Sequence, residues 1–105
     1  MSWSDCSVRV DHSKIRVDDQ HSKRRLVIKN PSRELFEKTQ FDGCVVSGEL
    51  AADWVIGCAG SLLIVELKGR DLQHGAKQVA ACAQWLKKHG RLPSSVGGVV
   101  LGTQY

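Results

Sequence analysis

The alternation of apolar and polar residues is clearest between residues 53 and 68. Residues 53–58 and 61–68 are two strand-like runs, and only Ala59-Gly60 separates them. A two-residue hairpin turn at this point sets Asp53 directly opposite Glu66. Both faces of the hairpin are apolar away from these charges, so we expect other elements to cover both faces.

Helical spacing follows in residues 71–90, where apolar side chains recur along one face. Asp71 is suited to cap the amino terminus of the helix and Gly90 to stop it. The internal Gly75 costs the helix about 1 kcal/mol relative to alanine. Residues 94–105 then form a last strand. Strand, helix and strand in this order predict a parallel strand pair within a mixed sheet.

The amino-terminal part alternates between short β-favouring runs and polar turns, which is typical of antiparallel strands. Pro31 near a helix start predicts a short helix over 30–38, and 41–48 is a strand candidate with a bulge at Gly43. The whole chain, 1–105, is therefore expected to be a single α/β domain with a mixed central sheet flanked by helices. Its central motif spans 41–90, and 1–40 is a strand-rich extension.

Charge points mildly to an anionic partner. The 105-residue chain carries a net charge of +4, with basic runs at 23–25 and 87–91. Nucleic-acid binding and a merely solvated basic surface explain this excess equally well. No apolar run approaches 18 residues and no secretion signal is recognisable, so we expect no membrane partner.

The four cysteines are predicted to be reduced. Their spacing contains no C-x-x-C pair and matches no familiar zinc pattern, and three of them lie among apolar residues. We therefore expect thiols in a cytoplasmic protein rather than metal ligands or a disulfide. The four are Cys6, Cys44, Cys58 and Cys82.

Three charged residues at the end of the hairpin carry the candidate chemistry. Asp53 and Glu66 repel each other when they lie opposite, and Lys68 projects on the same face. A magnesium ion shared by the two carboxylates, with the Leu67 carbonyl as a further ligand, relieves that repulsion. Such a metal activates water and a phosphodiester, and the lysine stabilises the developing charge. A purely structural ion-pair cluster is the alternative.

The motif "ADWVIG…VELKG…Q" resembles that of the PD-(D/E)XK nuclease superfamily, and the size is similar to that of the small Holliday junction resolvases within it. The resemblance implies a restriction-endonuclease-like fold, with Asp53 and Glu66 as metal ligands and Lys68 as the catalytic lysine. It further implies that Gln78 is an auxiliary site residue. An additional acid would come from an earlier helix, as Glu34 or Glu37.

The resemblance implies a Mg²⁺- or Mn²⁺-dependent endonuclease that hydrolyses phosphodiester bonds in DNA, with RNA the less favoured substrate. One small domain offers little surface for gripping a duplex, so we expect a homodimer or larger homo-oligomer. A catalytically inactive domain of the same fold, which binds nucleic acid or a protein partner, is the alternative. A third option is a nuclease subunit whose specificity lies in another chain.

Overall fold

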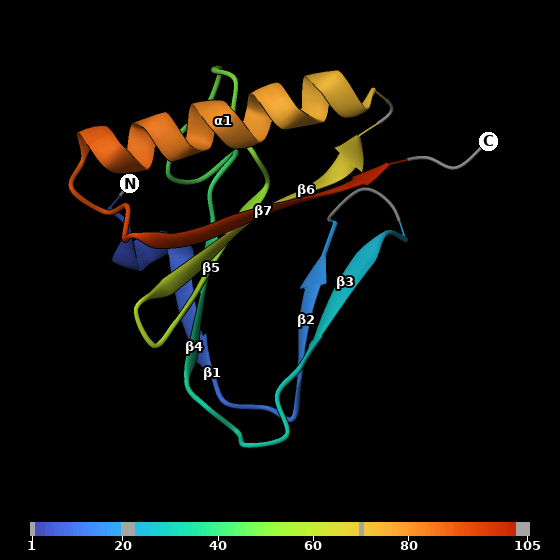
Figure 1. Ribbon diagram of the computed structural model, residues 1–105, viewed down its shortest axis with the longest axis vertical. Coiled ribbons are helices and arrows are strands. Elements are labelled where there is room, and N and C mark those ends of the chain that lie inside the picture. Colours follow the sequence, from blue (N-terminus) through green and yellow to red (C-terminus); the bar gives the residue numbers. More distant parts are fainter. Residues whose placement is uncertain (1, 20–22, 70, 103–105) are drawn as a thin grey trace.

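The β-strands of the computed structural model form two sheets, one of five strands and one of two (Figure 1). The structure describes residues 2–19, 23–69 and 71–102, apart from the side chains at 68 and 69. The elements in chain order are η1 (Ser4–Cys6), β1 (Ser7–Val10), β2 (Lys14–Asp18), β3 (Arg25–Lys29), β4 (Phe36–Gln40), β5 (Trp54–Cys58), β6 (Ser61–Gly69), α1 (Leu72–Lys88) and β7 (Ser95–Gly102). The large sheet has the order β1-β4-β5-β6-β7, and β2 pairs with β3 alone.

The β5–β6 hairpin has the register that the sequence predicts. Val55 pairs with Ile64 and Trp54 with Val65. Ala59 and Gly60 form the turn, with φ of 50° and 80°. Two consecutive residues with positive φ are typical of the tight hairpin turn whose twist matches that of the flanking strands. Asp53, one residue before β5, therefore continues the ladder opposite Glu66.

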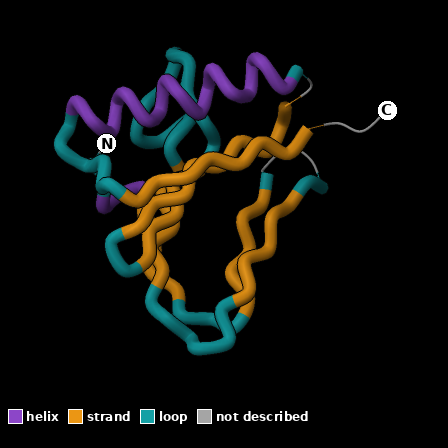
Figure 2. Tube along the Cα trace, in the orientation of Figure 1, coloured by secondary structure: helices purple, strands orange, loops and turns teal. Residues whose placement is uncertain are grey.

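Different elements cover the two faces of the large sheet. α1 lies across one face, and the β2–β3 hairpin lies against the other as a second layer (Figure 2). Val55 and Ile64 pack with Cys82 and Leu86 of α1. On the opposite face Ile56, Val65 and Leu67 pack with Val17 of β2, and partly buried side chains complete this cluster: Leu26, Ile28, Phe36, Trp54, Leu63 and Leu101. The predicted cover on both faces is confirmed, although only one layer is helical in the described part of the chain.

α1 packs closely on the edge of the sheet formed by β7. Asp71 caps the helix as predicted, because its Oδ1 accepts hydrogen bonds from the backbone N–H groups of Gln73 and His74. Gly75 is buried in the first turns, and a Cβ there would lie 2.6 Å from Cγ1 of Val100. Close approach to β7 therefore explains the glycine inside the helix. β7 runs parallel to β6, which confirms the predicted strand–helix–strand unit.

Two predicted elements are wrong. Residues 36–40 form β4 in place of a helix over 30–38, because this segment pairs with β1 on one side and with β5 on the other. Asn30 is buried, with a relative exposure of 3%. Its Nδ2 donates hydrogen bonds to His12 O and Glu34 O, and its Oδ1 accepts one from the N–H of Glu34. These three hydrogen bonds fix a turn. The expected strand over 41–48 is a set of turns with one isolated bridge, and Gly43 takes φ of 85°. Tertiary pairing has overridden local preference in 36–40, whereas local backbone hydrogen bonds from the N–H of Gly43 to Val46 O and from the N–H of Val46 to Phe41 O fold the second segment into turns.

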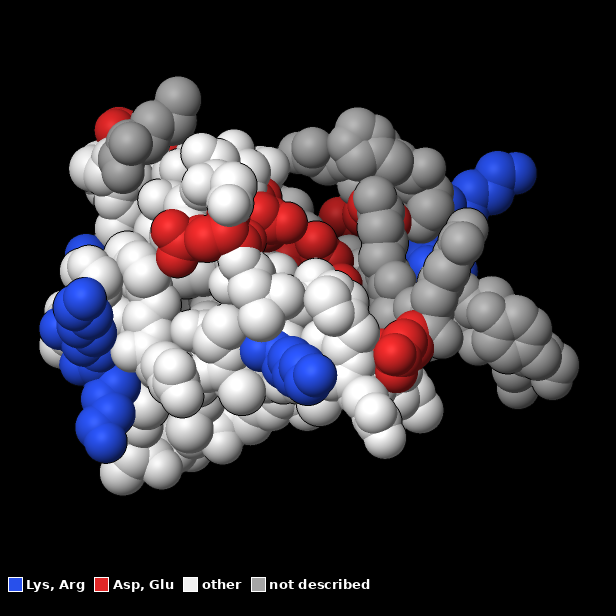
Figure 3. Space-filling view, turned by 90° about the horizontal axis from the view of Figure 1, so that it is seen from above, with Lys and Arg blue, Asp and Glu red and all other residues white. Residues whose placement is uncertain are grey.

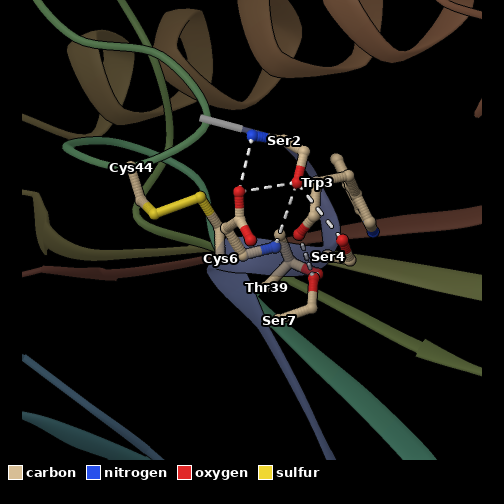
Figure 4. The surroundings of a disulfide bond; sticks show 8 residues. Ser2, Trp3, Ser4, Cys6, Ser7, Thr39 and Cys44 are labelled. Atoms are coloured by element: carbon tan, nitrogen blue, oxygen red, sulfur yellow. Dashed lines mark hydrogen bonds between the residues drawn. A yellow bond between two sulfur atoms is a disulfide. The ribbon is translucent and has the colours of Figure 1, made fainter.

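Cys6 and Cys44 form a disulfide, which contradicts the prediction of four reduced cysteines (Figure 4). The bond joins η1 to the loop between β4 and β5, across 38 positions of sequence. Sequence spacing cannot show such a pairing, because it depends on which loops the sheet brings together. Cys58 and Cys82 are free thiols. The disulfide also removes the basis on which a cytoplasmic location is predicted.

No helix in the described ranges combines the length and the apolar character needed to cross a membrane.

Candidate active site

Asp53 and Glu66 lie on the face of the sheet that α1 covers. They continue the alternation of Val55 and Ile64, whose side chains pack beneath the helix. Asp53 is half-buried, and its Oδ2 accepts a hydrogen bond of 2.8 Å from the backbone N–H of Leu67. This bond ties the start of β5 to the end of β6. It holds the Asp53 carboxylate next to the position of Glu66.

Glu66 is buried, with 2% of its surface exposed. A carboxylate at such depth is stable in its ionised form only when cations or several hydrogen-bond donors surround it. The register and the alternation of side chains thus set Asp53 and Glu66 on the same face of neighbouring strands, the face that α1 covers. Figure 3 views the molecule from the α1 side and shows a band of acidic residues across the middle of this face, with further acidic residues nearer its edges.

β6 carries an irregularity at the predicted motif. Glu66 pairs with Val100 of β7, whereas the next paired residues are Gly69 and Gly102. Between these two pairs β6 has two residues and β7 has one. One extra residue in one of two paired strands defines a β-bulge. Bulges redirect side chains and are frequent beside active sites. No sequence signal marks this bulge, because nothing in the run that ends in Glu66-Leu67-Lys68 breaks the strand pattern.

Lys68 lies within the bulge, and its side chain is outside the described part of the structure. Its predicted catalytic role therefore stays a prediction. Leu67 is fully buried against the β2–β3 layer, and its N–H is engaged with Asp53. The predicted use of its carbonyl as a metal ligand likewise stays a prediction.

Gln78 reaches the same region from α1. Its side-chain Nε2 donates a hydrogen bond of 3.3 Å to the backbone carbonyl of Ala51, two residues before Asp53. Ala51 and Ala52 are buried, so the segment leading into β5 is held between the helix and the sheet. The hairpin register and two hydrogen bonds therefore place three of the four predicted site positions at one end of the β5–β6 hairpin: Asp53, Glu66 and Gln78.

Glu34 and Glu37 lie elsewhere. The Glu34 carboxylate is 3.9 Å from the thiol of Cys58, and Glu37 accepts a hydrogen bond of 3.0 Å from Nε1 of Trp3. Glu37 stands opposite Gly57, four residues along β5 from Asp53. At about 3.3 Å per residue this is a separation of about 13 Å, too far for a shared metal ion. The wrong prediction of a helix over 30–38 explains why these acids were candidates.

The two free thiols, Cys58 and Cys82, both have raised pKa values. Burial raises the pKa of the Cys82 thiol to about 12, although the backbone of Ala52 opposes this effect. Desolvation and the neighbouring Glu34 carboxylate raise the pKa of Cys58 above its usual 9.0. Both groups are therefore protonated at neutral pH, which does not favour a nucleophilic or metal-ligating role.

A separate cleft of about 570 Å³ lies at the turn of the β5–β6 hairpin, at the opposite end of these strands from Asp53. Arg9, Glu37, Cys58 and Arg91 contribute to its lining. It contains none of Asp53, Glu66 and Gln78. The carboxylate pair and this cleft are therefore distinct features of the molecule.

The donor set suits a hard divalent cation. Mg²⁺ takes oxygen ligands, retains several waters and is often bound by one or two carboxylates. Asp53 and Glu66 provide such a pair, and their mutual repulsion favours a cation between them. The described residues contain no group of three or more His, Cys, Asp or Glu side chains arranged to hold a metal.

Comparisons with protein-family models, with curated proteins and with solved structures found no match to this chain.

Proposed function

We propose that this protein is a Mg²⁺- or Mn²⁺-dependent nuclease of the PD-(D/E)XK type that hydrolyses phosphodiester bonds in DNA. The register of the β5–β6 hairpin is the observation that carries the proposal. It puts Asp53 opposite Glu66 on one face, at the bulged end of β6. Two like charges directly opposite each other destabilise a strand pair unless a cation or hydrogen-bond donors compensate them.

The order of the elements also supports a restriction-endonuclease-like fold. β4, β5 and β6 form an antiparallel meander, and α1 then crosses over to the parallel strand β7. The carboxylates lie at the end of β6 that leads into this crossover. Both this order of elements and the sequence motif support the proposed membership of the superfamily.

In the proposed mechanism Asp53 and Glu66 hold the metal ion. When bound, the metal polarises the phosphodiester and lowers the pKa of a water molecule. The N–H of Leu67 fixes one oxygen of Asp53, so the carboxylate is oriented before the metal arrives. Burial restricts Glu66 in the same way. Lys68 supplies a positive charge for the developing negative charge on the phosphate oxygens. Gln78 positions the segment before Asp53 through Ala51.

We further propose that the active species is a homodimer. A single domain with extents of 34 × 34 × 25 Å offers one carboxylate pair and little surface for both strands of a duplex. Light scattering coupled to gel filtration tests this directly, and a monomer at assay concentration that still cleaves would contradict it.

A second function, binding by a catalytically inactive domain of the same fold, is favoured by a specific observation. One oxygen of Asp53 is already engaged by a backbone N–H, as in a carboxylate that serves only to clip two strands together. This alternative requires binding of nucleic acid or a protein without cleavage. It also requires that magnesium leaves the protein unchanged.

A cleavage assay separates the two. Supercoiled plasmid, linear duplex and RNA are incubated with the protein in Mg²⁺, Mn²⁺ or EDTA. We expect metal-dependent DNA cleavage that falls at least about a hundredfold in Glu66→Gln and Lys68→Met. Glu34→Gln and Glu37→Gln are matched controls, because they also neutralise single acids outside the site. Cleavage that survives in Glu66→Gln, or is absent in every metal, would contradict the proposal.

A further inference from the structure

The cleft at the β5–β6 turn is built on a row of paired residues that crosses four strands. Glu37 of β4 pairs with Arg9 of β1 on one side and with Gly57 of β5 on the other, and Gly57 pairs with Leu62 of β6. Residues paired in this way project on the same side of a sheet. Leu62 packs against the core cluster beneath α1, so the row lies on the face that α1 covers. All four residues line the cleft.

Gly57 leaves the middle of this row open. It does not take a positive φ, so its backbone conformation is one that other residues adopt equally well. A Cβ at this position would lie 3.1 Å from Cδ2 of Leu62 and 3.9 Å from Ser61 O. The missing side chain therefore creates space between Glu37 and Leu62, and this space forms the floor of the cleft.

A chain of contacts holds a second arginine close to Glu37. Nε1 of Trp3 donates a hydrogen bond of 3.0 Å to Oε1 of Glu37, and the Arg91 guanidinium lies 4.4 Å from the centroid of the Trp3 ring. The backbone N–H of Arg91 is also fixed, by a hydrogen bond to Leu86 O at the end of α1. A guanidinium that stacks on an aromatic face keeps its N–H donors free at its edge. Arg91 therefore contributes a positioned cation to the cleft.

Arg9 and Glu37 are not engaged with each other. Opposite charges on directly paired residues usually attract, since their Cβ atoms are about 4.5–5.5 Å apart. The ion pairs among the described side chains are both made by Asp18, and neither includes Arg9 or Glu37. Trp3 occupies one oxygen of Glu37. The cleft thus presents two guanidinium groups and one carboxylate side by side.

The remaining lining is partly apolar, with Leu62, Leu35, Leu92 and Pro93. A cleft of about 570 Å³ is within the usual range of small-molecule sites, about 300–1,000 Å³. A simple anion would be repelled by Glu37, and a simple amine by the two arginines. A molecule with adjacent charges of both signs on an apolar body satisfies all of these groups.

We propose that this cleft binds a free α-amino acid with an apolar side chain. Arg9 and Arg91 bind its carboxylate through charge-assisted hydrogen bonds, and Glu37 binds its ammonium group. The apolar side chain packs against Leu62 and its apolar neighbours in the lining. The site is separate from the proposed nuclease centre, because it contains neither Asp53 nor Glu66.

Binding is followed by NMR of the isotope-labelled protein, without metal or nucleic acid. The indole N–H of Trp3 reports on the cleft, because it is bonded to Glu37. The indole N–H of Trp54 is an internal control, because it is bonded to Asp18 O on the other side of the sheet. The two resonances are assigned with Trp3→Phe and Trp54→Phe. The probes are L-leucine, isocaproate (leucine without its amino group), isoamylamine (leucine without its carboxylate) and inorganic phosphate.

We expect L-leucine to shift the Trp3 resonance saturably at millimolar concentrations and to leave that of Trp54 unchanged. Isocaproate, isoamylamine and phosphate should each bind at least about tenfold more weakly, because each leaves a charged group of the cleft without a partner. These comparisons use the wild type alone, so they do not depend on the folding of any variant.

Variants then assign the roles of the charged groups. Arg9→Gln and Arg91→Gln should each weaken leucine binding about tenfold. Glu37→Gln should abolish the preference for leucine over isocaproate. Lys29→Gln is the matched control, because it removes one positive charge from an exposed position of β3. Circular dichroism verifies that each variant is folded.

Absence of a Trp3 shift with leucine would overturn the proposal. Binding of isocaproate or phosphate as tight as that of leucine would also overturn it, because it would show a site for simple anions. Equal losses in Lys29→Gln and the two arginine variants, or a preference for leucine that survives in Glu37→Gln, would do the same.

Discussion

Gly75→Ala tests how tightly α1 is held against β7. In an isolated helix this change is favourable by about 1 kcal/mol, because glycine has the greater freedom in the unfolded chain. In the protein the new Cβ would lie 2.6 Å from Cγ1 and 3.4 Å from Cγ2 of Val100. Carbon atoms in contact are normally about 3.5–4.0 Å apart, so the helix and strand would have to separate by about 1 Å.

The cost of such overpacking is about 1–3 kcal/mol, which exceeds the gain in helix propensity. Rotation of Val100 gives little relief, because both of its methyl groups face the glycine. We therefore expect Gly75→Ala to lower the free energy of unfolding by about 1 kcal/mol. Urea unfolding followed by circular dichroism measures the change.

Gly75→Ala in a protein that already carries Val100→Ala provides a stricter test of the packing explanation. Val100→Ala removes the clashing methyl groups, so Gly75→Ala in that background should stabilise the protein by about 0.5–1 kcal/mol. The change in the free energy of unfolding caused by Gly75→Ala therefore has opposite signs in the two proteins. Ala80→Gly, at an exposed position of α1, gives the propensity difference of this helix without any clash. A stabilising Gly75→Ala in the wild-type background, or the same sign in both backgrounds, would refute the packing explanation.

Further predictions concern the disulfide, the hairpin turn and the free thiols. Because the disulfide spans 38 positions, Cys6→Ser/Cys44→Ser should lower the unfolding free energy by about 4 kcal/mol in urea titrations, and an unchanged value would contradict a formed disulfide. Ala59 has φ of 50°, so Ala59→Asn should raise the midpoint of urea unfolding, corresponding to about 0.5–1 kcal/mol; a lower midpoint would show that the turn has another conformation. In the native protein Cys82 should resist an aromatic disulfide reagent until the chain unfolds, because its pKa is about 12 and it is buried. Cys58, whose pKa is raised above 9.0, should react slowly at neutral pH and faster as the pH rises, and rapid labelling at neutral pH would contradict the raised pKa.

The sequence predicts the carboxyl-terminal half of the fold well because its information is local. The turn at Ala59-Gly60 determines the register, and the register determines that Asp53 stands opposite Glu66. The helical period from Leu72 to Lys88 and the cap at Asp71 are equally local.

The amino-terminal half depends on contacts between distant segments, and there the predictions fail. β4 forms where a helix is expected, because β1 and β5 flank it on both sides. The Cys6–Cys44 disulfide depends on the same arrangement. The position of the β2–β3 layer, where Asp18 O accepts a hydrogen bond from Nε1 of Trp54, follows from burial of the second face of the sheet. A run of basic residues shows that charge is present but not where it lies.

The candidate site shows the same division. A sequence motif and the register of the hairpin are sufficient to predict Asp53, Glu66 and Gln78 as site residues. In the structure these three positions lie at one end of the β5–β6 hairpin. Glu34 and Glu37 depend on the predicted helix over 30–38, and the structure places them at the other end of β5. The bulge in β6 has no sequence signal, because it arises from the parallel pairing with β7.

Calorimetric titration of Mg²⁺ and Mn²⁺ into the wild type, Asp53→Asn and Glu66→Gln tests the central claim most directly. Glu34→Gln serves as the control for the loss of one acid outside the site. The nuclease proposal predicts one divalent-ion site in the wild type and in the control, which is lost in both site variants while circular dichroism shows that they remain folded. Absence of binding in the wild type at millimolar metal, or equal binding in all four proteins, would contradict it and leave Asp53 and Glu66 as a structural pair.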